Sequence, residues 1–74
     1  MKKSIYTKEY EHFTGQLKKA RLEAGYTQVD VAKKLKKSQS NISKEESGQV
    51  RLDVIQLKEY ARLYKRDISF FIMN

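Results

Sequence analysis

A short polar run near the middle of the chain carries the side chains that could do chemistry. From Ser38 to Lys44 the sequence reads SQSNISK, and Ile42 is its one strongly apolar residue. Hydroxyls, carboxamides and an ammonium of this kind hydrogen-bond to DNA base edges and to phosphates. A helix with a single apolar anchor contributes little to a core. The run therefore predicts a recognition surface for nucleic acid, with candidate contacts Gln39, Ser40, Asn41, Ser43 and Lys44.

Two short helices joined by a tight turn are needed to position this run. Thr27 is a good N-cap, and Asp30 three residues later makes a near capping box. The helix that Thr27 caps has one apolar face, formed by Val31, Ala32 and Leu35. Ser38 offers a second N-cap for a helix that runs from Gln39 to about Glu46, and Gly48 is suited to its end. The motif thus spans residues 27–48.

The net charge also indicates an anionic partner. Sixteen Lys and Arg residues against nine Asp and Glu give a formal charge of +7 and a pI near 9.7. Nucleic acid fits this charge best. An anionic membrane surface would call for a basic helix with a strong apolar face, and none stands out in the sequence.

Several other classes of function are disfavoured by what the sequence lacks. The chain has one histidine, His12, no cysteine and no glycine-rich phosphate loop, so no convergent acid, base and nucleophile set, metal site or cofactor site is expected. No apolar run approaches the length of a membrane span, and no signal-peptide pattern is present. We therefore expect a cytoplasmic protein that is not an enzyme and has no small-molecule effector.

The rest of the chain predicts a single all-α domain over residues 1–74, with five helices and no sheet. Residues 1–6 form a basic lead, and Thr7 caps a first helix that Gly25 ends. Its apolar stripe is Tyr10, Phe13, Leu17, Ala20 and Ala24. After a polar loop, Asp53 caps a helix whose expected buried side is Val54, Leu57, Tyr60, Ala61 and Tyr64. Asp67 caps a short last helix.

Taken together, these residues resemble the helix-turn-helix domain of the phage repressor and Cro type, the XRE family. The resemblance runs from about Leu17 to Ile72 and includes Thr27-Gln28, Val31-Ala32, Ser38-Gln39-Ser40, Ile42-Ser43 and Glu46 with Gly48. It implies a compact lambda-repressor-like bundle that acts as a sequence-specific transcriptional regulator, most often a repressor. The helix over residues 39–46 would then lie in the major groove of double-stranded DNA.

The resemblance also assigns roles to particular residues. It places Gln39, Ser40 and Lys44 at base edges, with Asn41 near them. It places Gln28, Ser38, Ser43 and Arg51 at phosphates. It further implies a largely buried ion pair between Arg21 and Glu46, which would tie the first helix to the recognition helix.

Four residues, at three places in the chain, depart from the family pattern. Lys36 and Lys37 stand where the turn usually has a glycine and then an apolar residue, and Lys65 replaces a second turn glycine. Glu45 occupies a usually apolar, inward-facing position, where a buried carboxylate is costly unless it is paired. The turn lysines could face phosphates, and Glu45 could reach either Arg51 or a water-exposed edge.

A second function and the state of assembly remain as alternatives. The same fold can serve as a protein-interaction module, like an antitoxin or an anti-repressor, and such a module would show an apolar or acidic recognition face. Crowded apolar residues at the C-terminal end predict a homodimer through Phe70, Ile72 and Met73. The alternative is a monomer whose tail folds back over the first helix.

Overall fold

The computed structural model describes residues 7–72, and all regular structure in this range is helical. The elements are α1 (Lys8–Glu23), α2 (Gln28–Leu35), α3 (Gln39–Ser47), α4 (Val54–Tyr64) and α5 (Ser69–Ile72). The predicted all-α fold with five helices is confirmed. None of these helices combines the length and the apolar character that crossing a bilayer requires. The basic lead at residues 1–6 and Met73 lie outside the described residues.

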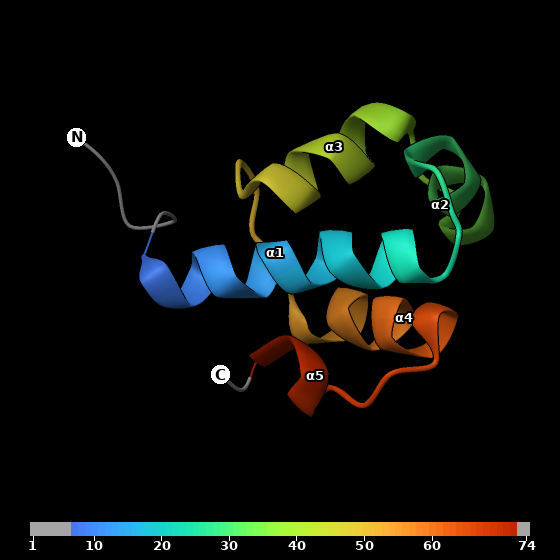
Figure 1. The fold of residues 1–74 in the computed structure, drawn as a ribbon. Helices are drawn as coiled ribbons and strands as arrows, with labels where there is room; N and C mark the ends of the chain where they lie inside the picture. Colours follow the sequence, from blue (N-terminus) through green and yellow to red (C-terminus); the bar gives the residue numbers. More distant parts are fainter. Residues whose placement is uncertain (1–6, 73–74) are drawn as a thin grey trace.

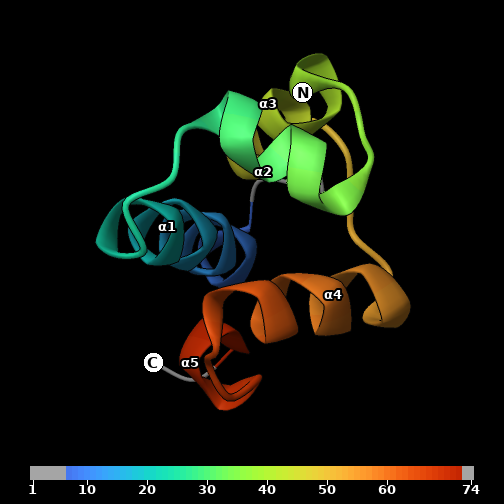
Figure 2. The same ribbon diagram turned by 90° about the vertical axis from the view of Figure 1, so that its right-hand side faces the viewer.

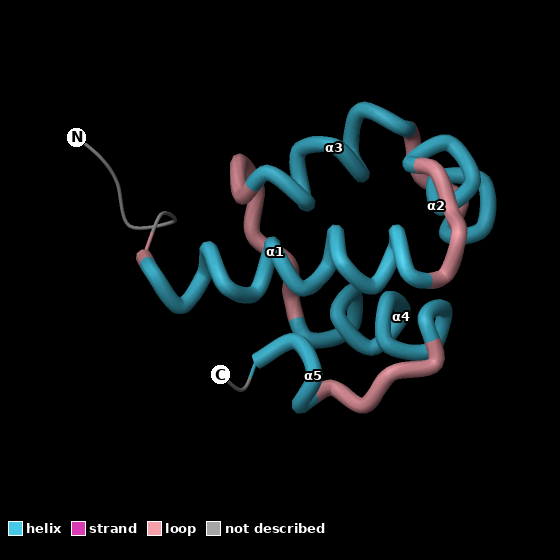
Figure 3. The backbone as a smooth tube through the Cα atoms, viewed as in Figure 1, coloured by secondary structure: helices cyan, strands magenta, loops and turns pink. Residues whose placement is uncertain are grey.

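Helix α1 lies at the centre of the bundle (Figure 1). The helix-turn-helix pair α2 and α3 packs on one side of it, and α4 and α5 pack on the other, as the turned view confirms (Figure 2). Short loops connect consecutive helices (Figure 3). Every helix contributes to one core, formed by Phe13, Leu17, Ala20, Val31, Ala32, Ile42, Tyr60, Ala61, Tyr64 and Phe71.

Four helices begin at the predicted caps, because a side-chain oxygen there accepts an otherwise unsatisfied backbone N–H. These caps are Thr7, Thr27, Ser38 and Asp53. Thr27 with Asp30, and Asp53 with Gln56, complete reciprocal capping boxes. Ahead of α5, Asp67 accepts the backbone N–H of Ser69 at 2.9 Å. The starts of the helices are therefore set locally.

The same four helices also end in one kind of turn, in which a backbone N–H reaches the carbonyl five residues earlier. These bonds are Tyr26 to Arg21, Lys37 to Ala32, Gln49 to Lys44 and Arg66 to Ala61. The residue at the turn has a positive φ in each case: Gly25 (80°), Lys36 (58°), Gly48 (85°) and Lys65 (57°). A lysine in this left-handed conformation costs on the order of 1 kcal/mol. The two lysines thus keep the turn geometry that glycine usually supplies.

Two residues of the predicted core are exposed instead. Ala24 lies at the C-terminal cap of α1, one position past the last helical turn that the core covers. Val54 is the first residue of α4 and is 65% exposed. Both follow the correct helical period but lie at helix ends, where no neighbouring element reaches over them.

Candidate nucleic-acid interface

Helix α3 presents an uninterrupted polar face to solvent. Its single large apolar side chain, Ile42, is completely buried against the rest of the bundle. The predicted contact residues on the opposite face are all exposed: Gln39, Ser40, Asn41, Ser43 and Lys44. The helix therefore has one side committed to packing and another available for a partner.

Ser38 has a structural role at the start of this helix. Its Oγ accepts the backbone N–H of Asn41 at 3.1 Å, which makes it the N-cap. The residue is exposed. Because a hydroxyl both donates and accepts, its O–H can still donate to an anionic oxygen.

Gln28 and Gln39 are hydrogen-bonded to each other across the helix-turn-helix. Gln39 Nε2 donates to Gln28 Oε1 at 3.0 Å, and Gln28 Nε2 donates to Glu46 Oε1 at 3.2 Å. Gln28 is half-buried. It therefore holds the Gln39 carboxamide at the surface and joins it to the buried carboxylate beneath.

The structure brings Arg21 and Glu46 into contact. Arg21 Nε lies 2.7 Å from Glu46 Oε2, and the two side chains are 10% and 4% exposed. Arg21 Nη1 also donates to the Tyr26 carbonyl at 3.1 Å. The pair thus ties α1 to α3 and to the loop before α2.

Glu45 contacts neither of the partners expected for it. It is 4% exposed, and both of its carboxylate oxygens accept from Lys37 Nζ, at 3.1 and 2.9 Å. The Tyr60 hydroxyl donates to Glu45 Oε1 at 2.5 Å. The expectations of a bond to Arg51 or of a water-exposed edge are therefore wrong. Lys37 points inward as well, so of the two turn lysines it is Lys36 that remains exposed.

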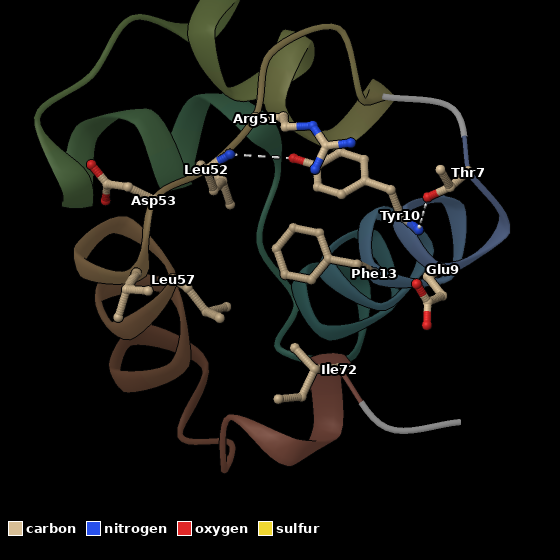
Figure 4. Close-up of a pocket in the computed structure, with 10 residues that line it drawn as sticks. Thr7, Glu9, Tyr10, Phe13, Arg51, Leu52, Asp53, Leu57 and Ile72 are labelled. Carbon is tan, nitrogen blue, oxygen red and sulfur yellow. Dashed lines mark hydrogen bonds between the residues drawn. The ribbon is translucent and has the colours of Figure 1, made fainter. Parts of the chain in front are cut away.

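The loop after α3 is fixed by Tyr10. The Tyr10 hydroxyl donates to the Val50 carbonyl at 3.3 Å and accepts the Leu52 N–H at 3.2 Å. The Arg51 guanidinium lies 4.7 Å from the Tyr10 ring centroid, and Figure 4 shows it across the face of the ring. A tyrosine of α1 thus bonds to the backbone on both sides of the exposed Arg51 and contacts its guanidinium.

The C-terminal residues differ in how much surface they show. Phe70 is half-buried, with the Arg66 guanidinium 4.5 Å from its ring centroid. Ile72 is 59% exposed and lines a groove with Phe13, Val54 and Leu57 (Figure 4). Part of the Phe70 ring is therefore covered within the chain, and of these two residues Ile72 is the more exposed.

Sequence reasoning missed three side chains that shape this surface: Lys37, Tyr60 and Tyr10. The one signal for the first two was the carboxylate of Glu45 at an apolar position, which requires a cation or a hydroxyl nearby. Tyr10 and Tyr60 were predicted as core aromatics, and their hydroxyls were not assigned. Within residues 7–72, no three His, Cys, Asp or Glu side chains gather closely enough to hold a metal ion.

A capped helix, a tight turn and a second capped helix with a polar outer face define the helix-turn-helix class of protein. The sequence model of the helix-turn-helix family matches residues 17–71, and the chain belongs to this family, the Cro/C1 type. Family membership makes it a DNA-binding helix-turn-helix regulator. No curated protein and no solved structure gives a significant match.

Proposed function

We propose that the chain is a sequence-specific repressor that lays α3 in the major groove of double-stranded DNA and acts by occupying its site. The observation that carries this proposal is the division of α3 into a buried Ile42 and a fully exposed polar face. Gln39, Ser40 and Lys44 would face base edges, with Asn41 beside them. Phosphate contacts would come from Gln28, Ser38, Ser43 and Arg51.

The contacts around α3 support this division of roles. The bond to Gln28 holds the Gln39 carboxamide in place before DNA arrives, which reduces the entropy lost on binding. The stacking of Arg51 on Tyr10 does the same for a phosphate-facing guanidinium. A protein-interaction module would favour apolar or aromatic side chains on this face. The exposed residues from Gln39 to Lys44 are polar, which favours DNA.

The test is selection of a preferred site from random duplex DNA, followed by titrations at several salt concentrations. A dimer that neutralises about six to ten phosphates should give a slope of log affinity against log salt between about −5 and −9. Gln39→Ala should cost about 1–3 kcal/mol on the selected site and little on scrambled DNA. Arg51→Ala should weaken binding to both duplexes by a similar factor.

Wild-type chain with a slope near zero, or with no preferred site, would contradict the proposed function. Equal losses on both duplexes for Gln39→Ala would contradict the assignment of the base-reading face. Lys58→Ala, which removes an exposed lysine of α4, is the control for the loss of one positive charge.

We also propose that the chain binds as a homodimer through the face around Ile72. Ile72 and Val54, at 59% and 65% exposed, line the groove of Figure 4, whose other lining residues include the apolar Phe13 and Leu57 and the charged Glu9, Arg51 and Asp53. A protruding side chain beside a hollow is what an isologous interface needs, because the same patch must serve both copies. Phe70, which is half-buried and does not line this groove, and Met73, which follows Ile72 in the sequence, complete the proposed interface. Such a dimer would present two recognition helices to half-sites about 34 Å apart.

A further inference from the structure

Two consecutive carboxylates of α3 point into the molecule and contact different neighbours. Successive residues of a helix are rotated by about 100° around its axis. Glu46 meets Arg21 of α1 and Gln28 of α2, whereas Glu45 meets Lys37 in the turn and Tyr60 of α4. The recognition helix is therefore anchored by polar bonds in two directions.

The Glu45 anchor, formed by Lys37, Glu45 and Tyr60, is compact and nearly dry. The Lys37 and Glu45 side chains are 14% and 6% exposed. Lys37 Nζ also lies 5.3 Å from the centroid of the Tyr60 ring, which is itself completely buried. Breaking a buried ion pair by removing one partner leaves an uncompensated charge, so this anchor strongly resists displacement.

The direction of this anchor matters because the two other buried anchors of α3 lie on one line, and the remaining bond, from Gln39 to Gln28, is exposed and lies on the side away from Glu45. Ile42 and Glu46 are four residues apart and therefore share one stripe of the helix. A helix held along a single stripe can roll about that stripe. The Glu45 anchor lies off it and prevents the roll.

We propose that Lys37 and Glu45 are positioning residues for base reading, which fix the roll of α3 so that Gln39, Ser40 and Lys44 face the DNA. This inference rests on the proposed function. Lys37 acts through Glu45, because two of the three N–H donors of its ammonium point to the Glu45 carboxylate and its side chain is only 14% exposed. If Lys37 instead contacted a phosphate, its replacement would reduce the salt slope by about one and leave the ratio of specific to non-specific affinity unchanged.

Lys37→Met tests the proposal, with Lys36→Asn as the matched control. Lys36 is the adjacent exposed lysine, and asparagine tolerates its left-handed backbone. In the absence of DNA, Lys37→Met should raise hydrogen-exchange rates of the α3 amides about tenfold relative to those of α1. On DNA, it should lower the ratio of specific to non-specific affinity roughly tenfold and leave the salt slope unchanged. Lys36→Asn should leave both exchange and the affinity ratio as in wild type.

The double variant Lys37→Met/Glu45→Met separates positioning from stability. Replacing a buried ion pair by apolar side chains is often neutral or stabilising. The double variant is made on a Tyr60→Phe background, because Glu45→Met would otherwise leave the buried Tyr60 hydroxyl without an acceptor, and this chain should fold even where Lys37→Met alone does not. Methionine is flexible and fixes no direction, so the double variant should remain less discriminating than wild type.

Three results would overturn the proposal. The first is a stable double variant with full discrimination, and the second is a folded Lys37→Met chain with wild-type exchange in α3. The third is a salt slope for Lys37→Met that falls by about one while the affinity ratio is retained, which would make Lys37 a phosphate contact. The exchange measurement needs no DNA. It therefore judges the anchor even if the chain binds no duplex and the proposed function fails.

Discussion

At the scale of single residues, the two buried tyrosines of α4 differ in what their hydroxyls do. Tyr60 and Tyr64 lie one turn apart with their rings stacked, the centroids 5.9 Å apart. The Tyr60 hydroxyl donates to Glu45, whereas the Tyr64 hydroxyl is buried with no hydrogen-bond partner among the described residues. The pair therefore separates the effect of a satisfied buried hydroxyl from that of an unsatisfied one.

We expect Tyr60→Phe to lower the free energy of unfolding by about 2 kcal/mol, because it removes a hydrogen bond to a charged group. Tyr64→Phe should leave this free energy unchanged or raise it by about 1 kcal/mol, because it removes a hydroxyl that is desolvated without compensation. Urea denaturation of both variants checks this. Equal losses would mean that the Tyr60 hydroxyl bond contributes nothing specific.

Alkaline titration provides a second measurement on the same pair. Burial, joined for Tyr60 by the bond to Glu45, raises the pKa of both phenols above the ordinary 10.0. Above pH 10 the unfolded chain releases these protons and the folded chain keeps them. The contribution of these two phenols to the free energy of unfolding is therefore fully present below pH 10 and is lost as the pH rises beyond it. The fall should be shallower in each phenylalanine variant.

Glu45 illustrates what the sequence could and could not predict at this scale. The sequence predicted the need for a partner, because a carboxylate at an inward position is costly when unpaired. The identity of the partner depended on which of sixteen basic residues the fold brings close, and spacing along the chain does not encode that. Neither open alternative, Arg51 or a water-exposed edge, is what the structure shows: Lys37 and Tyr60 hold the carboxylate, and the Arg51 guanidinium lies over the ring of Tyr10.

At the scale of elements, helix starts were predictable and the limits of their buried faces were not. A cap is a bond between residues three apart, so Thr7, Thr27, Ser38 and Asp53 are readable from sequence alone. Periodicity gives the face of a helix that turns inward but not where the neighbouring helix ends. Val54 therefore follows the pattern and still lies in solvent.

The elements are joined by ion pairs of different burial, and this leads to a prediction. Arg21→Ala should lower the free energy of unfolding by about 3 kcal/mol, because it strands the buried Glu46 of α3. Arg66→Ala breaks the pair between Arg66 and Glu23, and these two side chains are 37% and 45% exposed. This change should lower the free energy of unfolding by about 1 kcal/mol or less. Thermal or denaturant unfolding of the two variants compares them. A wild-type midpoint for Arg21→Ala would mean that α1 and α3 are joined by apolar packing alone.

At the scale of the whole molecule, the proposed dimer can be tested with two isoleucines of similar exposure. Ile72 borders the groove at 59% exposed, whereas Ile55 is 63% exposed and does not line it. Sedimentation at micromolar concentration should show a wild-type dimer that Ile72→Ser converts to a monomer and Ile55→Ser leaves intact. Loss of an apolar anchor at an interface centre typically costs about 2 kcal/mol or more.

A wild-type monomer would mean that there is no such interface. Dissociation by Ile55→Ser and not by Ile72→Ser would place the interface on another face. The sequence predicted apolar excess at the C-terminal end but assigned it first to Phe70. Arg66 lies over that ring, a contact between residues four apart that the helical pattern did not reveal because α5 begins only at Ser69.

Tyr10 lies where these proposals meet. Its ring lines the groove that a second copy would cover, its face supports Arg51, and its hydroxyl holds the loop between α3 and α4. Pairing of two copies would therefore also order the loop that carries Arg51, a proposed phosphate contact. Equilibrium linkage makes such an effect reciprocal: DNA would strengthen dimerisation by the same factor by which dimerisation strengthens DNA binding. Occupancy of the DNA site would then rise steeply over a narrow range of protein concentration. Through its contacts with both surfaces, Tyr10 would make DNA binding sensitive to the concentration of the protein itself.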